Sequence, residues 1–204
     1  MNTHEEFVER KFEKVSKLIP PNSKILDVGC GDGKIRLFLK NPIYFGADAD
    51  EELISKLISQ KIKAKKTDLN KDEIPFKNEK FDFVLLLDVL EHVVNPKKLL
   101  LEAKERLNEN GKLIITLPND YHLLNKIRFV FNKHLTEDPF APHGHLHYFP
   151  IKSGERFLLK NNFKIFKKIY LASVKPKIVP QSIKENLTLF FPQAFSRDTL
   201  YVIS

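Results

Sequence analysis

Short apolar runs and helical patterns follow one another along the chain up to Pro118. Residues 5–19 carry apolar side chains at helical spacing, and Pro20-Pro21 ends that helix. Five runs then predict strands, at 24–28, 43–47, 62–67, 81–87 and 112–117. Helices are predicted between them, from the glycine turn through Leu39, after Asp48-Ala-Asp-Glu-Glu, and over 96–107, where Pro stands at the start and Asn110-Gly111 at the end.

Strict alternation of strand and helix with short links predicts a parallel sheet covered on both faces. The run 81–87 is the most hydrophobic and is typical of a strand buried on both faces, whereas the lysine-rich run 62–67 suits an edge. A ligand is expected at the carboxyl ends of the strands, where the strand order reverses.

The pattern changes after Pro118. An amphipathic helix is predicted over 119–135, with Leu123, Leu124, Ile127, Val130, Phe131 and Leu135 on one face. In order of preference, it is a lid over the site, a membrane-surface helix, or a packing helix. A helix follows at 151–161, and 163–173 with 199–204 suit an antiparallel pair that closes the sheet's edge. We expect one domain over 1–204, with a lid or substrate region at about 119–149.

Composition adds bounds to this picture. Apolar residues make up 42% and charged residues 29%, which is ordinary for a globular protein. The longest apolar run, around 84–87, is too short to span a bilayer, and no charged region followed by an apolar stretch opens the chain. Because Cys30 is the single cysteine and cannot form an internal disulfide, we expect a protein of the reducing cytoplasm.

The net charge of +8 suggests three kinds of partner: nucleic acid, an anionic membrane or an acidic substrate. Lysines gather at 61–66, 164–168 and 175–177, but most others alternate with Glu, as on a solvated surface. Nucleic acid is therefore possible as a partner but not favoured.

The segment Ile25-Leu-Asp-Val-Gly-Cys-Gly-Asp-Gly-Lys34 joins an apolar strand to a glycine turn and a helix. Glycine tolerates left-handed angles and lets a ligand approach the backbone, so the amides of 31–34 can point at an anion. A nicotinamide fingerprint needs glycine where Lys34 stands, and no Gly-Lys-Ser/Thr follows to make a phosphate-binding P-loop.

Acidic residues follow the next three strands. Asp48 comes after the second, where a carboxylate can accept both hydroxyls of a ribose, while Asp50 suits the cap of the next helix. Asp68 follows the third strand, either as a turn residue or as an acceptor for an adenine amino group. Asp88 and His92 follow the fourth, at the mouth of the sheet or at an ordinary helix start.

Taken together, Leu26-Asp-Val-Gly-Cys-Gly-Asp-Gly, Gly46-Ala-Asp48, Asp68-Leu69, Leu90-Glu-His-Val93 and Gly111 through Asn119 resemble the class I S-adenosylmethionine (SAM) methyltransferases of the type 11/23 group. That resemblance implies a Rossmann-like three-layer α/β sandwich with a mostly parallel seven-stranded sheet, an antiparallel last strand and a helical lid insertion. It also implies that SAM lies across the first, second and fourth strands.

The same resemblance implies where each part of the cofactor lies. Asp27, Gly29 and Gly31 border the methionine part, Asp48 holds the ribose, Asp68 and Leu69 meet the adenine, and Asp88 lines the methyl pocket. The full expected cofactor-binding set also includes Cys30, Gly33, Ala49, Val89 and His92. The SAM carboxylate suits helix-start amides, and its two cationic groups favour carboxylates.

A looser similarity links Pro118-Asn119, the segment from Gly144 to Phe149 and the closing residues to MetW-type and glycan-associated methyltransferases. The histidine of those groups corresponds to His145 in one and to His147 in the other. Either imidazole is a candidate for the base that takes the acceptor's proton, His145 before His147, or the side chains only hydrogen-bond within the loop.

Alternation also puts His143, His145 and His147 on one face if this segment is a strand. No metal site is expected, because no carboxylate or cysteine nearby completes the set and a flexible loop is a poor preformed site.

The function expected from the sequence is methyl transfer from SAM to a small-molecule or glycan-like acceptor. One alternative is an RNA methyltransferase, although the chain lacks both the Asn/Asp-Pro-Pro-Tyr/Phe signature and a Pro-Cys nucleophile. Others are a SAM-binding partner subunit without its own turnover, and a nicotinamide dehydrogenase.

Overall fold

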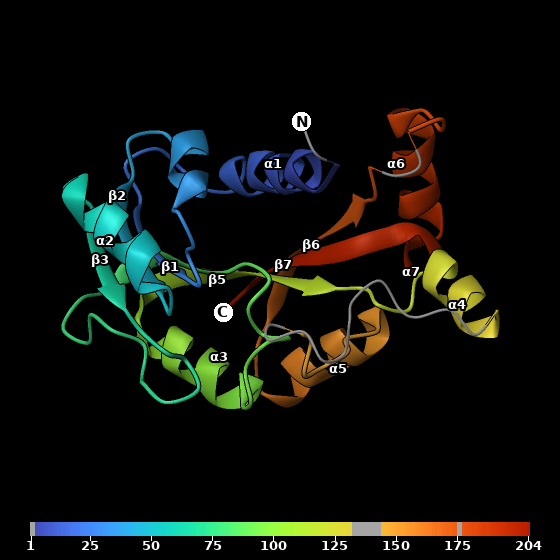
Figure 1. The fold of residues 1–204 in the computed structure, drawn as a ribbon. Helices are drawn as coiled ribbons and strands as arrows, with labels where there is room; N and C mark the ends of the chain where they lie inside the picture. Colours follow the sequence, from blue (N-terminus) through green and yellow to red (C-terminus); the bar gives the residue numbers. More distant parts are fainter. Residues whose placement is uncertain (1–2, 132–143, 175–176) are drawn as a thin grey trace.

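The computed structural model describes residues 3–131, 144–174 and 177–204. A seven-stranded sheet runs through its centre in the order β3-β2-β1-β4-β5-β7-β6 (Figure 1). The strands are β1 (Lys24–Val28), β2 (Ile43–Asp48), β3 (Lys63–Lys66), β4 (Phe81–Leu86), β5 (Leu107–Pro118), β6 (Ile165–Ala172) and β7 (Ser196–Ile203). The first five pair in parallel, and β7 is antiparallel to both β5 and β6. The predicted fold class is confirmed, including the edge position of β3.

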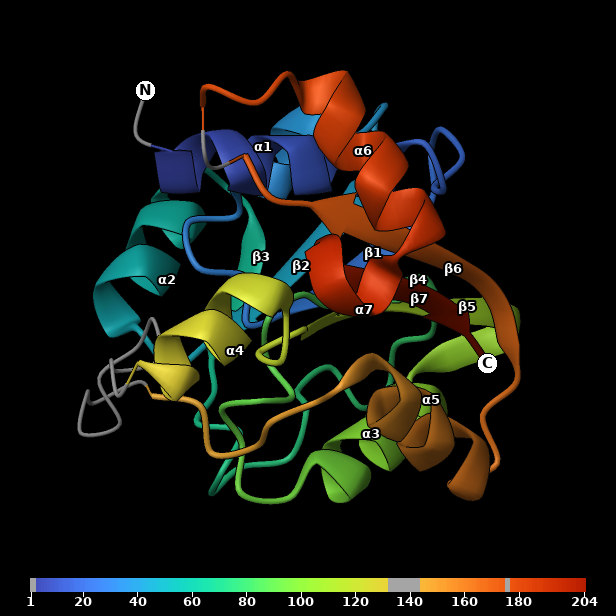
Figure 2. The same ribbon diagram turned by 90° about the vertical axis from the view of Figure 1, so that its right-hand side faces the viewer.

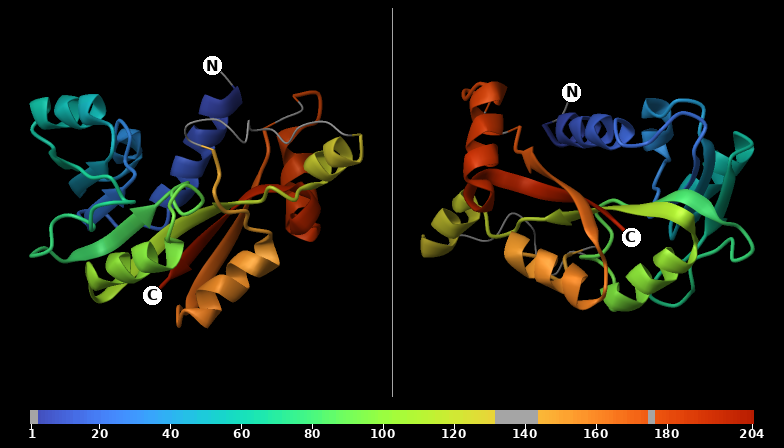
Figure 3. Two further views of the ribbon diagram at one scale, coloured as in Figure 1. Left: turned by 60° about the horizontal axis from the view of Figure 1, so that its bottom comes forward. Right: turned by 180° about the vertical axis from the view of Figure 1, so that it is seen from behind.

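Two hydrophobic clusters cover the two faces of this sheet. Alternating side chains of β1, such as Ile25 and Leu26, belong to different clusters. Helices α1 (Thr3–Ser16) and α2 (Glu51–Ser59) pack on one face, and α3 (Pro96–Glu105) and α5 (Ile151–Lys160) on the other. Figure 3 shows α1 and α6 (Gln181–Phe190) across the sheet from α3 and α5.

The structure corrects several predicted boundaries. Helix α1 ends at Ser16 and not at 19, and β7 begins at Ser196 and not at 199. The helix after the glycine turn is a short 3₁₀ segment, η1 (Lys34–Phe38). Helix α3 ends at Glu105, and β5 already begins at Leu107, well before the predicted 112. The extra residues are absorbed by a register shift against β4 between Phe81 and Phe83, so Asn110-Gly111 lies within the irregular strand and not after the helix.

The region after β5 differs most from its prediction. Helix α4 spans only Leu123–Val130. Residues 119–122 form a turn and not the predicted first part of the helix, and residues 132–135, with Leu135, lie outside the described residues. Its apolar residues remain exposed: Leu124 is 51% exposed and Val130 is 78% exposed. The long connection to β7 holds two helices that were not predicted, α6 and α7 (Pro192–Phe195).

These helices surround the carboxyl ends of the central strands. Figure 2 looks at this end of the sheet and shows α4, α6 and α7 gathered there, with α1 beside α6 at the top. No helix in the described part of the chain is long and apolar enough to cross a membrane.

Candidate active site

The glycine turn after β1 has the backbone that its sequence predicts. Gly29, Gly31 and Gly33 have φ of +76°, +52° and +66°, in the left-handed region. The N–H groups of Gly29 and Cys30 both donate to the carbonyl of Ala47, at 2.7 and 3.0 Å, which ties the turn to β2. A Cβ on Gly29 would lie 2.5 Å from Val89 Cγ2, whereas one on Gly31 would meet nothing within 4 Å. A side chain therefore has no room at Gly29, whereas the space beside Gly31 is empty.

Asp27 lies at the buried end of this turn. Its Oδ2 accepts a hydrogen bond from the Tyr44 hydroxyl at 2.6 Å. Burial raises the pKa of Asp27 to about 7, and the Tyr44 hydrogen bond opposes that rise. Near neutral pH this carboxyl is poised to gain a charge when a cation approaches.

Asp48 ends β2 and Asp50 follows it; the structure shows the cap expected of Asp50, and the ribose role of Asp48 stays a prediction. Asp48 Oδ2 accepts from the Gly31 N–H at 2.7 Å, so this carboxylate stands beside the open glycine. Asp50 accepts from the N–H groups of Glu52 and Leu53 at 2.9 and 3.0 Å, which confirms it as the cap of α2. Ala49 lies between them, and Cys30 is buried, with its Sγ against Gly46.

Asp68 lies in the turn after β3, where it accepts from the Asn70 N–H at 3.1 Å and pairs with Lys71 at 2.9 Å. The Lys71 hydrogen bond lowers the pKa of Asp68 below its ordinary value. Leu69, next to it, packs partly buried against the core. Asp68 is thus a turn residue, and a role toward adenine stays a prediction.

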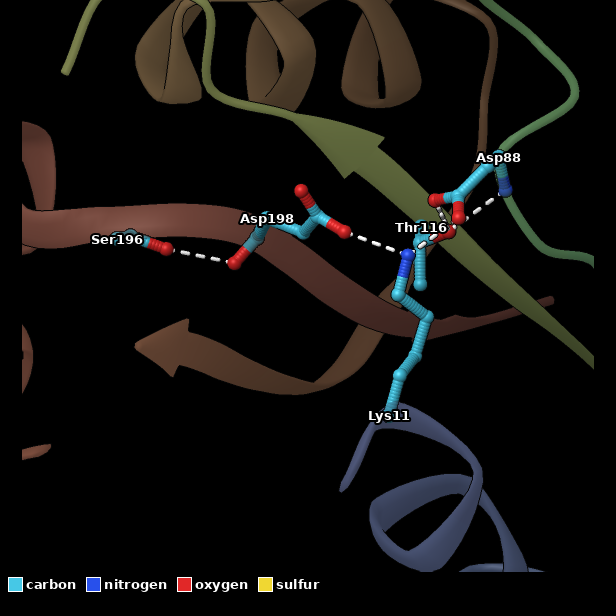
Figure 4. A network of polar contacts seen from close by, with 5 residues as sticks. All are labelled: Lys11, Asp88, Thr116, Ser196 and Asp198. Carbon is cyan, nitrogen blue, oxygen red and sulfur yellow. Dashed lines mark hydrogen bonds and ion pairs between the residues drawn. The ribbon is translucent and has the colours of Figure 1, made fainter. Parts of the chain in front are cut away.

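Asp88, after β4, takes part in a polar network that the sequence did not indicate (Figure 4). Its N–H donates to Thr116 Oγ1 at 2.8 Å, and the same hydroxyl donates back to Asp88 Oδ1 at 2.7 Å. Lys11 of α1 reaches across to pair with Asp88 and, at 2.5 Å, with Asp198 of β7. Asp88 holds a φ of +57°, a strained angle for a residue with a side chain and one that is common at functional sites.

The charges of this network depend on one another. Burial alone would lower the pKa of Lys11, but the carboxylates of Asp198 and Asp88 raise it above its ordinary value. Burial alone would raise the pKa of Asp88, but Lys11 and Thr116 outweigh that effect and lower it. An ammonium and an ionised carboxylate therefore lie at the mouth of the sheet.

A cavity of about 600 Å³ opens beside Asp88 and His92. Its walls come from α1, the segment after β5, α4, and the region from α6 to β7. Apolar side chains such as Phe7, Leu123 and Leu187 line it together with charged ones. Gly29, Asp48 and Asp68 do not line it, so the cavity does not include the glycine turn. Its size is that of a pocket for a small molecule.

The histidines of the 144–149 segment separate in the structure. His145 lines the cavity, and its Nδ1 lies 3.3 Å from Asp120 Oδ1. His147 points elsewhere, with its Nε2 2.9 Å from the carbonyl of Val93. His143 lies outside the described residues. Glu91, which is 1% exposed, lies beside His92 and His145 at the cavity. The sequence does not reveal this cluster, because Glu91 and His92 are far from His145 along the chain.

Comparison with known proteins agrees with this geometry. A family model described as "Methyltransferase domain" matches residues 2–168. The chain belongs to the class I SAM-dependent methyltransferases. An uncharacterised protein of Methanocaldococcus jannaschii is 33% identical over 185 residues, which cover 85% of this chain and 77% of that protein.

Two further relatives of this methyltransferase are informative. A Rickettsia typhi protein named ubiquinone biosynthesis O-methyltransferase is 32% identical over 120 residues, covering 56% of this chain but only 46% of that enzyme. The crystal structure of a SAM-dependent methyltransferase from Archaeoglobus fulgidus superposes with a TM-score of 0.64 at 18% identity, covering 97% of this chain and 93% of that one. The latter shows the common fold.

The residues present at the glycine turn fit SAM. The space left open at Gly31 gives room for a ligand against the backbone, and the carboxyls of Asp27 and Asp48 border the turn. Two cationic groups on the cofactor match this acidic surrounding.

Proposed function

We propose that this methyltransferase transfers the methyl group of SAM to an oxygen or nitrogen of a small, partly polar or glycan-like molecule that binds in the cavity beside Asp88. The observation that carries the proposal is the position of the cavity. It begins at Asp88 and His92, where the expected cofactor site ends, so an acceptor within it meets the methyl end of the cofactor.

Bound SAM supplies an activated methyl group on a sulfonium, so the protein's task is to align the acceptor and exclude water. On this proposal Asp27, Gly29 and Gly31 border the methionine part, Asp48 holds the ribose, Asp68 and Leu69 lie toward the adenine, and Asp88 faces the methyl group. The remaining contacts come from Cys30, Gly33, Ala49, Val89 and His92.

The lining of the cavity favours a small acceptor with both apolar and polar parts. Phe7, Leu123 and Leu187 supply apolar walls, and Arg128 and Asp120 supply opposite charges. The name of the R. typhi relative denotes an O-methyltransferase of ubiquinone biosynthesis, which is consistent with methylation of an oxygen.

His145 is the residue of the 144–149 segment that we expect to act on the acceptor's proton. It faces the cavity, and Asp120 orients its ring. His147, the second candidate from the sequence, is engaged with the Val93 carbonyl and does not line the cavity.

The test combines SAM binding with an acceptor screen. Calorimetry with purified protein should show SAM binding, and methyl-labelled SAM with a panel of hydroxylated and amino compounds should give a labelled small-molecule product. With that acceptor, His145→Gln should lower kcat at least 100-fold, whereas His147→Gln, matched in chemistry, should change it only a few-fold.

Two outcomes would overturn the proposal. Absence of SAM binding would remove the enzyme assignment for this chain. If the label appeared in RNA and in no small molecule, and RNA binding weakened steeply with salt, the protein would instead be an RNA methyltransferase, the alternative that its charge of +8 suggests.

A further inference from the structure

Glu91, His92 and His145 come together at the cavity from distant parts of the sequence. Their potential ligand atoms, one from each side chain, all lie within 4.8 Å of one another. The rings of His92 and His145 meet edge to face, with centroids 4.9 Å apart. Glu91 is buried, and the two imidazoles are partly buried.

The backbone around this cluster is held in place. The N–H groups of Leu146 and His147 both donate to the carbonyl of Glu91, at 2.7 and 3.1 Å. The His147 side chain adds a contact to Val93. The segment that looks like a free loop in the sequence is thus fastened to the residues after β4, and the cluster is preformed.

Glu91 is buried, and its Oε2 has no hydrogen bond among residues 3–131, 144–174 and 177–204. A buried carboxyl oxygen without a partner costs free energy, and a bound cation would supply that partner.

Each histidine also has the outer contact that is usual for a metal ligand. His145 Nδ1 lies 3.3 Å from Asp120 Oδ1, and His92 Nδ1 lies 3.4 Å from the carbonyl of Gly144. Metal-binding imidazoles generally donate their second N–H to a carboxylate or a backbone carbonyl, which fixes the ring and its tautomer.

We propose that Glu91, His92 and His145 bind a divalent first-row transition-metal ion, of the zinc or manganese type, at the floor of the acceptor cavity. Two imidazoles and one carboxylate are a ligand set that such ions use with further positions left open. Ligands on a common ion at about 2.1 Å lie roughly 3 to 3.5 Å apart, so ligand atoms that are now up to 4.8 Å apart need to approach one another by up to about 1.3 to 1.8 Å. All three side chains line the cavity.

This inference deepens the proposed function and rests on it for its catalytic part. An ion held here lowers the pKa of an acceptor hydroxyl at the cavity floor, whose proton passes to solvent water. The acceptor oxygen then forms its bond to the methyl carbon as the carbon–sulfur bond breaks, and that electron pair stays on sulfur in S-adenosylhomocysteine. His145 acts on the acceptor's proton as a ligand of the ion, not as the group that receives the proton.

The first test is metal binding without catalysis. Protein freed of metal with a chelator and dialysed is titrated with Zn²⁺ and Mn²⁺ by calorimetry, and Co²⁺ is followed by its visible absorption. We expect one ion per chain. Glu91→Gln, which keeps size and removes the charge, should weaken binding at least tenfold, while His122→Asn, a histidine of the same cavity outside the cluster, should leave it unchanged.

The outcomes separate this inference from the function it rests on. Wild-type protein that binds no ion, or an ion that Glu91→Gln binds as well as wild type does, overturns the metal site while SAM binding and methyl transfer stand. SAM titration of Glu91→Gln and its thermal unfolding show that the variant is folded. If the ion binds through Glu91 but SAM does not bind, the proposed function fails and the site remains.

Discussion

Asp27 shows how one buried side chain couples SAM binding to pH. The carboxyl is buried at the end of β1, and its pKa of about 7 leaves it half protonated near neutral pH. If the ammonium of SAM lies beside it, as the resemblance implies, the cofactor binds best to the ionised form. Binding then releases a proton.

We therefore expect SAM affinity to rise with pH up to about 7, by at most tenfold per pH unit, and to level off above it. Calorimetry in buffers of different ionisation enthalpy measures both the affinity and the proton released. Asp27→Asn should bind more weakly and lose this pH dependence.

Tyr44→Phe gives an independent check on the same residue. The Tyr44 hydrogen bond lowers the pKa of Asp27, so its loss should move the midpoint of the affinity curve to higher pH. A midpoint that stays in place, or moves lower, would contradict this account of Asp27.

The sequence predicted those residues whose role depends on near neighbours. Asp50 caps α2 through the amides of Glu52 and Leu53, contacts that a local pattern reveals. Lys11 and Glu91 could not be found in this way. Lys11 meets Asp88 and Asp198 only after α1 folds onto the sheet, and no spacing along the chain marks it.

Among the elements, the turn between β1 and η1 contains three glycines, of which Gly29 and Gly31 have different surroundings. Both have a positive φ, which costs an alanine about 1–2 kcal/mol. Only Gly29 of this pair also has a neighbour, Val89, in the space of a Cβ. One glycine is thus needed for packing, and the other leaves room for a ligand.

Gly31→Ala should lower the free energy of unfolding by about 1–2 kcal/mol yet weaken SAM binding more than tenfold, because its methyl group enters the open space. Gly29→Ala should lower stability further, by about 2–4 kcal/mol, through overpacking against Val89. Urea unfolding and SAM titration measure the two effects.

The pair Gly29→Ala and Val89→Ala provides the matched control. Removing the Val89 side chain makes room for the new methyl group, so the double variant should be more stable than the sum of the single changes indicates. If the losses in the free energy of unfolding simply added, the clash between the new methyl group and Val89 would not be the cause of the lower stability of Gly29→Ala.

At the level of elements, the periodic part of the chain was predictable and the remainder was not. β1 was predicted at its observed bounds, since an apolar run between turns has few other solutions. The start of β5 was misplaced because Asn110-Gly111 suggests a turn, while in the fold these residues extend an irregular strand that pairs with β4. Helix α6 was missed within a connection punctuated by prolines.

Across the whole molecule, Lys11 links three separate elements. Its ammonium, on α1, lies between Asp88 after β4 and Asp198 on β7, and the side chain is 2% exposed. Apolar residues such as Phe7 and Val15 also pack α1 against the sheet, and the Arg197 guanidinium of β7 lies over the Phe7 ring. The ion cluster therefore fixes how α1 lies over the cavity in which the acceptor is proposed to bind.

Lys11→Met should keep most of the volume of the side chain and leave the buried carboxyl group of Asp198 facing the partly exposed one of Asp88. Removal of one partner from a buried ion cluster costs about 3–5 kcal/mol, so we expect a loss of that size in the free energy of unfolding by urea. Lys14→Met, on the exposed side of the same helix, should change it by less than about 0.5 kcal/mol. Adding Asp198→Asn to Lys11→Met removes one of the opposed charges and should recover part of the loss. Equal losses for Lys11→Met and Lys14→Met, or no recovery in the double variant, would mean that apolar packing alone holds α1 over the cavity.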